Sequence, residues 1–149
     1  MSALAVLLAV TAITAGCGGA GGAIDLADYE RALGALRDEE GDGQLHGARI
    51  DGGEITFDLV REGPATRVRW SGGELEDTDG EVFAGPYFDI ADLSTEGARA
   101  LIEAAPVDVD SIEYTVDDRG RVQATLVGAE RTFIAGVDGS DLRELRPAG

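Results

Sequence analysis

A spacing of 67 residues relates the positions that start, reverse and bury secondary structure in this chain of 149 residues. At that offset Asp25 meets Asp92, and Gly53 meets Gly120. Further matches fall on inward strand positions and later turns: Leu26 and Leu93, Ile55 and Val122, Leu59 and Leu126, Val60 and Val127, Gly72 and Gly139, and Leu75 and Leu142. Because caps, turns and buried faces all agree, the pattern predicts one structural unit repeated twice.

The first copy of the unit is predicted to be a helix followed by three strands. Apolar residues at helical spacing, with Asp25 as N-cap and Gly41 after the last turn, predict a helix over 25–39. Alternation of apolar and polar residues, interrupted by turn residues, predicts strands at 44–50, 54–61 and 66–70. We expect the acidic stretch 71–81 to be a loop and residues 82–90 to include a short strand.

The second copy repeats this order. A helix over 94–105 is predicted, capped by Asp92 or Ser94 and ended by Pro106. The strands that follow are predicted at 111–116, 121–127 and 132–137, with a last strand near Leu142 and Leu145 left open.

The fold class predicted from this order is α+β, with two tandem αβββ units whose antiparallel sheet or sheets pack against two helices. Each half has too little apolar surface to be stable alone, so residues 24–149 are expected to form one domain with halves at about 24–90 and 91–147. One sheet and two sheets are both compatible with the sequence. The predicted core comprises Tyr29, Leu33, Leu36, Phe57, Leu59, Trp70, Leu101, Ile102, Tyr114 and Leu126.

The N-terminal segment is apolar and uncharged from residue 2 to residue 16. As a helix it would reach only about 22 Å, short of a hydrocarbon core of about 30 Å, so it is predicted to be a signal peptide and not a membrane span. It ends in Thr14-Ala15-Gly16-Cys17, which resembles a bacterial lipobox. Thr14 stands where leucine is usual, and no basic residue precedes the apolar run, which leaves the start codon open.

The lipobox resemblance implies cleavage after residue 16 and a lipid anchor, carrying fatty acids such as palmitate, on the sulfur of Cys17. Residues 17–23 would then form the lipidated cysteine and a flexible glycine-rich tether. The implied location is the outer face of the cell membrane. Since Cys17 is the only cysteine, an intramolecular disulfide is excluded.

The order of elements over about residues 24–147 resembles small bacterial lipoproteins of the PepSY-like or β-lactamase-inhibitor-protein-like class. All 12 basic residues are arginine, which we interpret as codon bias in a GC-rich, actinobacterial genome. The resemblance implies binding of a protein or peptide, and no functional residue can be carried over from it.

The net charge of -17 lies on the part of the chain that follows the tether. An acidic surface repels phosphate backbones and anionic lipid headgroups, so nucleic acid is excluded as an expected partner and membrane contact is expected only through the anchor.

Residues that could carry chemistry are sparse. The single histidine, His46, has no nucleophile motif beside it and too few companions for a zinc site, so we expect a surface or half-buried strand residue. Gly16, Gly18 and Gly21 match a dinucleotide-binding spacing but lie at the signal-peptide junction. Weak binding of a divalent ion is left open for one acidic cluster: Glu74, Glu76, Asp77, Asp79 and Glu81. No catalytic residue, cofactor or metal ligand is predicted.

These features favour a membrane-anchored, non-enzymatic binding or regulatory module for a protein or peptide of the cell envelope. Two alternatives stay open: a carrier of lipid or small molecules, and a hydrolase that uses carboxylates in a cleft. Trp70 is expected in the core, whereas Tyr87 and Phe88 lie in a connection where binding residues often occur. Partner identity and oligomeric state are not determined by the sequence.

Overall fold

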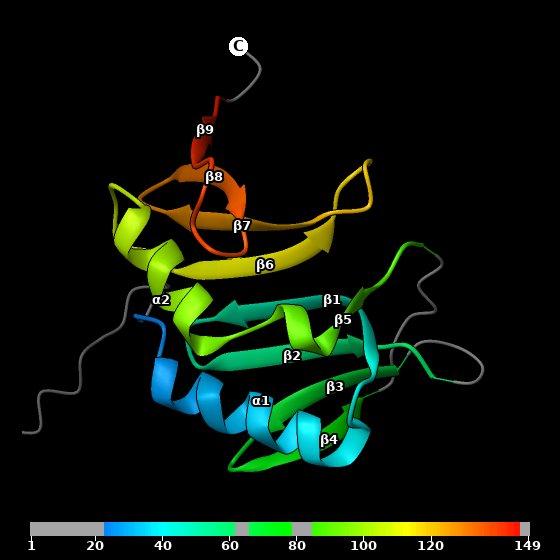
Figure 1. Cartoon of the computed structure of the whole chain (residues 1–149). Coiled ribbons are helices and arrows are strands. Elements are labelled where there is room, and N and C mark those ends of the chain that lie inside the picture. Colours follow the sequence, from blue (N-terminus) through cyan, green and yellow to red (C-terminus); the bar gives the residue numbers. More distant parts are fainter. Residues whose placement is uncertain (1–22, 62–65, 79–84, 147–149) are drawn as a thin grey trace, which may run out of the picture.

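A computed structural model describes residues 23–61, 66–78 and 85–146. Within these residues the protein is α+β, as predicted, with two α-helices and one nine-stranded antiparallel sheet (Figure 1). The sheet is continuous, which decides between the one-sheet and two-sheet arrangements. Cys17 and the rest of the predicted signal peptide lie outside the described residues.

The helices are α1 (Leu26–Glu40), α2 (Thr95–Ala104) and a short 3-10 turn, η1 (Ile90–Asp92). The strands are β1 (Gln44–Asp51), β2 (Glu54–Leu59), β3 (Thr66–Ser71), β4 (Glu74–Thr78), β5 (Phe88–Asp89), β6 (Ser111–Val116), β7 (Val122–Gly128), β8 (Arg131–Gly136) and β9 (Arg143–Leu145).

Both helices begin where the sequence places an N-cap. Asp25 precedes α1, and its side chain accepts a hydrogen bond from the backbone N–H of Asp28 (3.1 Å). Ser94 caps α2 by accepting from Gly97 N–H (2.9 Å), whereas the alternative cap Asp92 lies in η1. Each cap pairs one of the N–H groups that the first helical turn leaves without a partner.

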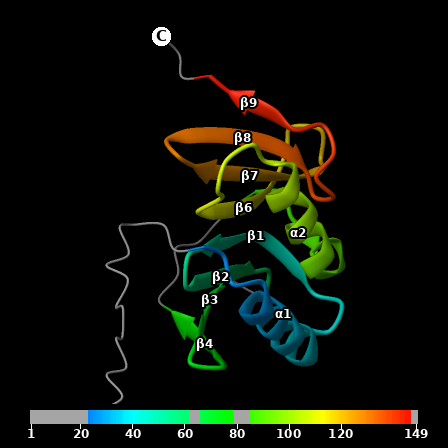
Figure 2. The ribbon, with the colours of Figure 1, turned by 90° about the vertical axis from the view of Figure 1, so that its left-hand side faces the viewer.

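The strand order is β4-β3-β2-β1-β6-β7-β8-β9, so the sheet is built outward from the junction of β1 and β6 (Figure 2). The N-terminal half supplies one end of the sheet and the C-terminal half the other. Four strands of each half lie on this path and β5 pairs with β1 beside it, so two units of one helix and three strands do not describe the arrangement.

The predicted loop over 71–81 is wrong where it covers β4. Gly72 and Gly73 both have positive φ (59° and 87°), as a type I′ hairpin turn requires. The chain therefore returns along β3, and Leu75 pairs with Trp70 and packs against the core. The charged residues of β4 are tolerated because an edge strand exposes most of its side chains.

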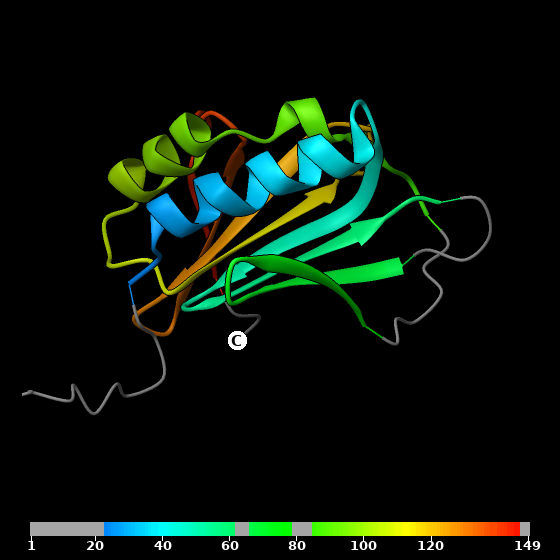
Figure 3. The same cartoon turned by 90° about the horizontal axis from the view of Figure 1, so that it is seen from below.

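Helices α1 and α2 both lie on one face of the sheet, and no helix of the described residues covers the opposite face, which we call the open face (Figure 3). Nine of the ten predicted core residues are buried between the layers, and Ile102 is only partly buried. Trp70 is 7% exposed and Phe88 5%, so Phe88 belongs to the core and not to an exposed patch. The covered face thus holds the stabilising apolar contacts and leaves the open face available for other roles.

Candidate functional site

The open face of the sheet carries polar and charged side chains in register from strand to strand. Since side chains alternate between faces, the neighbours of the buried Ile50 and Ile55 point away from the helices. One row of paired residues crosses eight strands in the order Arg143, Ile134, Thr125, Glu113, Arg49, Thr56, Arg69 and Glu76. Four of the five charged residues of this row lie on β6, β1, β3 and β4.

A β-bulge in β1 interrupts the centre of this face. Leu45 pairs with Leu59 and Gly47 pairs with Asp58, so His46 is the additional residue. Beyond the bulge, β1 also changes its other neighbour: residues 44–45 pair with β5, whereas residues 48–51 pair with β6. The bulge therefore lies where β5 replaces β6 as the neighbour of β1.

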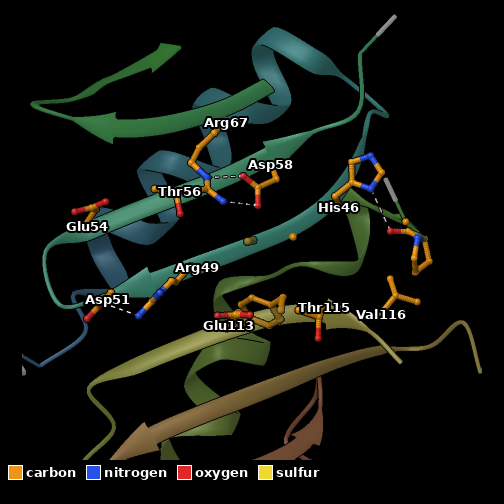
Figure 4. Close-up of a pocket in the computed structure, with 15 residues that line it drawn as sticks. His46, Arg49, Asp51, Glu54, Thr56, Asp58, Arg67, Glu113, Thr115 and Val116 are labelled. Carbon is orange, nitrogen blue, oxygen red and sulfur yellow. Dashed lines mark hydrogen bonds and ion pairs between the residues drawn. The ribbon is translucent and has the colours of Figure 1, made fainter. Parts of the chain in front are cut away.

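A hollow of about 490 Å³ occupies the open face at this point, and we call it the central hollow (Figure 4). It lies over β1, β2 and β6, with a contribution from β3 and from the segment before β5. Its lining consists of His46, Gly47, Ala48, Arg49, Asp51, Glu54, Thr56, Asp58, Arg67, Gly85, Pro86, Glu113, Tyr114, Thr115 and Val116. Gly47 helps to keep the space open, because a Cβ there would lie 3.4 Å from Tyr114 O and 3.5 Å from Asp58 Oδ2.

Two ion pairs use the arginines of the central hollow. Arg67 donates to both carboxylate oxygens of Asp58, with distances of 2.7 and 3.3 Å, across paired positions of β3 and β2. Arg49 Nη2 lies 3.0 Å from Asp51 Oδ2 on its own strand, although the residue paired with Arg49 in β6 is Glu113. The arrangement holds the guanidinium groups against carboxylates and orients Asp58 through two hydrogen bonds.

His46 closes one end of the central hollow. Its Nδ1 lies 3.2 Å from the carbonyl oxygen of Pro86. Because a carbonyl oxygen only accepts, this contact requires the proton on Nδ1 and leaves Nε2 as an acceptor in the neutral ring. The ring also meets Tyr87 edge to face, with centroids 6.3 Å apart and planes at 83°. As predicted, His46 is a half-buried strand residue.

The acidic cluster predicted from the sequence does not converge in the described part of the chain. Asp79 and Glu81 lie outside it, Glu76 pairs with Arg69 (3.6 Å) and Asp77 pairs with Arg61 (3.2 Å). Among the described residues no group of three or more His, Cys, Asp or Glu side chains is placed to hold a metal ion. Glu74, Glu76 and Asp77 are thus residues of an edge strand.

The carboxylates whose pKa is lowered lie in turns and in an ion pair at the end of the sheet. Backbone N–H groups of Arg121 and Arg119 lower the pKa of Asp117, and the Ser140 side chain and backbone lower that of Asp138. The Arg131 guanidinium lowers the pKa of Glu144. These shifts reflect the favourable partners of the charged form and stabilise the turns and the edge.

Burial raises the pKa of two tyrosines inside the core. The pKa of Tyr114 rises to about 12, and that of Tyr29 rises well above its ordinary value through burial and the neighbouring Tyr114. Neither hydroxyl has a hydrogen-bond partner of good geometry among the described residues. Both side chains are buried on the helix side of the sheet, and the backbone of Tyr114 is the part near Gly47 in the central hollow.

Sequence reasoning missed the bulge, and with it the central hollow. A signal for it exists in β1. Leu45 and Ile50 are both fully buried, yet they lie five positions apart, which is an odd number. Strict alternation would place them on opposite faces, so a strand that buries both must contain an additional residue.

These features define an α+β protein whose sheet has one face covered by helices and one open face with a charged hollow. No protein-family model matches the chain, and no curated protein matches it in sequence. Among solved structures, the chain is similar to a Clostridium difficile protein described as a "putative lipoprotein", with a TM-score of 0.47 and 11% identity over 87% of this chain and 93% of that one. Similarity at that level leaves the function to be argued from the residues themselves.

None of the helices in the described part of the chain has the length and apolar character needed to cross a membrane.

Proposed function

We propose that this chain is a lipoprotein held at the outer face of a bacterial cell membrane by lipid on Cys17. The support comes from the sequence. An uncharged apolar run ends in two small residues, Ala15 and Gly16, directly before the only cysteine. Small residues at these positions let a signal peptidase reach the bond before Cys17, and the thiol is the group that accepts a diacylglyceryl chain.

The anchor is tested by replacing Cys17 with alanine in cells that produce the chain. With Cys17 present, we expect incorporation of labelled palmitate and recovery in the membrane fraction. The Cys17→Ala variant should take up no label and should leave the membrane fraction. Unchanged mass and unchanged membrane recovery in the variant would contradict a lipid anchor.

We further propose that the α+β body is a non-enzymatic module that binds a protein or peptide on its open face. The observation that carries this proposal is the central hollow, which lies in the middle of a sheet face that neither helix covers. The polar and charged lining favours a polypeptide over a lipid, since carriers of lipid need an apolar cavity. Glu54 and Glu113 are exposed on this face, so neither is shielded from water as a catalytic acid or base often is.

A duplicated origin fits the proposed module. The strand order is the same on both sides of the β1–β6 junction, and the spacing of 67 residues relates the turns that open β2 and β7. We propose that the two halves are copies of one unit of the PepSY-like type, with a fourth strand added to each. The halves no longer match on the open face, where charge is concentrated on β1, β2 and β3.

Binding through the open face is tested with a photo-crosslinking amino acid placed at one of two positions. Thr56 lies in the central hollow, and Asp38 is exposed on α1. In cells producing the anchored chain, we expect a discrete protein or peptide adduct from position 56 and none from position 38. Absence of any adduct at 56, or the same adducts at both positions, would overturn the assignment of this face.

A further inference from the structure

The charges that face the central hollow are not balanced among themselves. Both arginines of the lining are engaged, Arg67 with Asp58 and Arg49 with Asp51. Glu54 and Glu113 also line the hollow, and neither forms an ion pair within the described residues. The charge that remains available to a ligand is therefore negative, on a chain that is itself strongly acidic.

The two glutamates lie on opposite sides of β1. Glu54 is the β2 partner of Asp51, and Glu113 is the β6 partner of Arg49, so they are two strands apart and displaced by two residues along the strand direction. With standard strand spacing and rise, their backbone positions are about 12 Å apart. Side chains four residues apart on one side of an extended polypeptide are separated by about 13 Å. An extended segment can thus place one basic side chain against each glutamate.

An exposed aromatic ring stands next to the same hollow. Tyr87 is 54% exposed, the largest exposure among the large apolar side chains of the described residues. Its edge-to-face contact with His46, and the hydrogen bond from His46 to Pro86, hold the ring beside the lining. An exposed aromatic ring next to a hollow that carries unpaired carboxylates suits guanidinium and ammonium groups, which are attracted to both kinds of group.

Resting on the proposed binding function, we infer that the partner segment is an extended basic polypeptide, with two arginine or lysine side chains four residues apart that reach Glu54 and Glu113. A second copy of this chain is disfavoured as the occupant, because two chains that each carry a net charge of -17 repel one another. Anionic lipid is disfavoured for the same reason. A polypeptide with spaced positive charges matches both the sign and the separation of the available carboxylates.

The probe for this inference is a fluorescein-labelled serine/threonine peptide with two arginines four residues apart. Its binding to the full-length chain, kept reduced at low salt, is measured by fluorescence anisotropy. Two peptides of equal length serve for comparison, one with glutamates in place of the arginines and one with adjacent arginines. We expect the spaced-arginine peptide to bind more tightly than the adjacent-arginine peptide, and the glutamate peptide to show no binding.

A matched pair of variants separates site binding from general attraction to an acidic protein. The double variant Glu54→Gln/Glu113→Gln removes the two available carboxylates of the central hollow. The control Glu30→Gln/Glu103→Gln removes two exposed carboxylates from the helix side and changes the net charge equally. The hollow variant should weaken peptide binding about fivefold, as expected for the loss of two exposed ion pairs, and the control should weaken it less than about twofold.

Equal weakening by both double variants would show non-specific attraction and would overturn the inference. Absence of binding by the spaced-arginine peptide, or preference for adjacent arginines, would overturn it as well. A crosslinked partner at position 56 together with any of these results would leave the binding function standing and reject only the basic character of the segment. Failure of both experiments would remove the binding function itself.

Discussion

Two glycines, one on each helix, provide a test of how α2 is packed. Gly34 in α1 is exposed, and a Cβ built there meets nothing within 4 Å. Gly97 in the first turn of α2 differs, since a Cβ there would lie 2.6 Å from Val137 O and 3.0 Å from Ser94 Oγ. The same change, Gly→Ala, is therefore expected to have opposite effects on the free energy of unfolding.

The magnitudes follow from helix propensity and from overpacking. Gly34→Ala should stabilise the protein by about 0.5 to 1 kcal/mol, because alanine lowers the entropy of the unfolded chain and fits the helix. Gly97→Ala gains a similar stabilisation from helix propensity. However, its added Cβ must displace the backbone of Val137 or the helix cap, which costs about 1 to 3 kcal/mol. The two variants should differ by about 2 kcal/mol, or by about 6 to 8 °C in Tm for a domain of this size.

The assay is urea unfolding followed by the fluorescence of Trp70, the only tryptophan in the chain and only 7% exposed. Measuring Gly97→Ala in the Gly34→Ala background keeps the protein stable enough for a complete transition. If Gly97→Ala stabilises the protein as much as Gly34→Ala does, the close approach of α2 to the segment after β8 is refuted.

Three further outcomes follow from single contacts. Asp28→Ala removes the acceptor of the Trp70 Nε1–H hydrogen bond (2.8 Å). Tryptophan emission should therefore shift to the red, and the free energy of unfolding should fall by about 1 kcal/mol. Unchanged emission would contradict the contact. The pKa of Asp117 is lowered below its ordinary 3.8, so its carboxylate stabilises the fold above that pH and the contribution disappears as pH falls through the lower folded pKa. Stability of Asp117→Asn should therefore depend less on pH in this acidic range, and an identical acid-unfolding curve would be evidence against it. Arg131 donates to both carboxylate oxygens of Glu144 (2.9 Å each), so Glu144→Gln should speed hydrogen exchange in β9 alone, and unchanged exchange there would reject a role for the pair.

The proposed anchor and the proposed site set different constraints on the molecule. The proposed anchor depends on residues around Cys17, and the proposed site depends on β1, β2 and β6. In chain order, the tether is followed by α1 and then by β1. Lipid on Cys17 would keep the α+β body near the membrane. The negative charge of that body would keep it away from anionic lipid headgroups. The open face is then available to a partner in the surrounding envelope.

Local chemistry allowed much of the fold to be predicted. Asp25 and Ser94 fix the starts of the helices, because their side chains satisfy N–H groups that a helix cannot satisfy itself. The turns at Gly53 and Gly120 fix the hairpins, and period-two alternation fixes which side chains of β2, β6 and β7 are buried. Such signals operate within a few residues and need no knowledge of the rest of the chain.

Tertiary structure alone decided how the halves meet. Pairing of β1 with β6 joins residues 60 to 66 positions apart, and nothing local in either strand specifies the other. The same pairing accounts for the bulge at His46, because β1 must change its neighbour from β5 to β6 while burying both Leu45 and Ile50. Strand β4 likewise exists because β3 offers it an edge and the core accepts Leu75, against the weak strand preference of its acidic residues. Local residue patterns therefore specify the helices, most strands and the inward faces. The central hollow depends on long-range pairing, because the energy of that pairing comes from contacts between segments that are distant in the sequence.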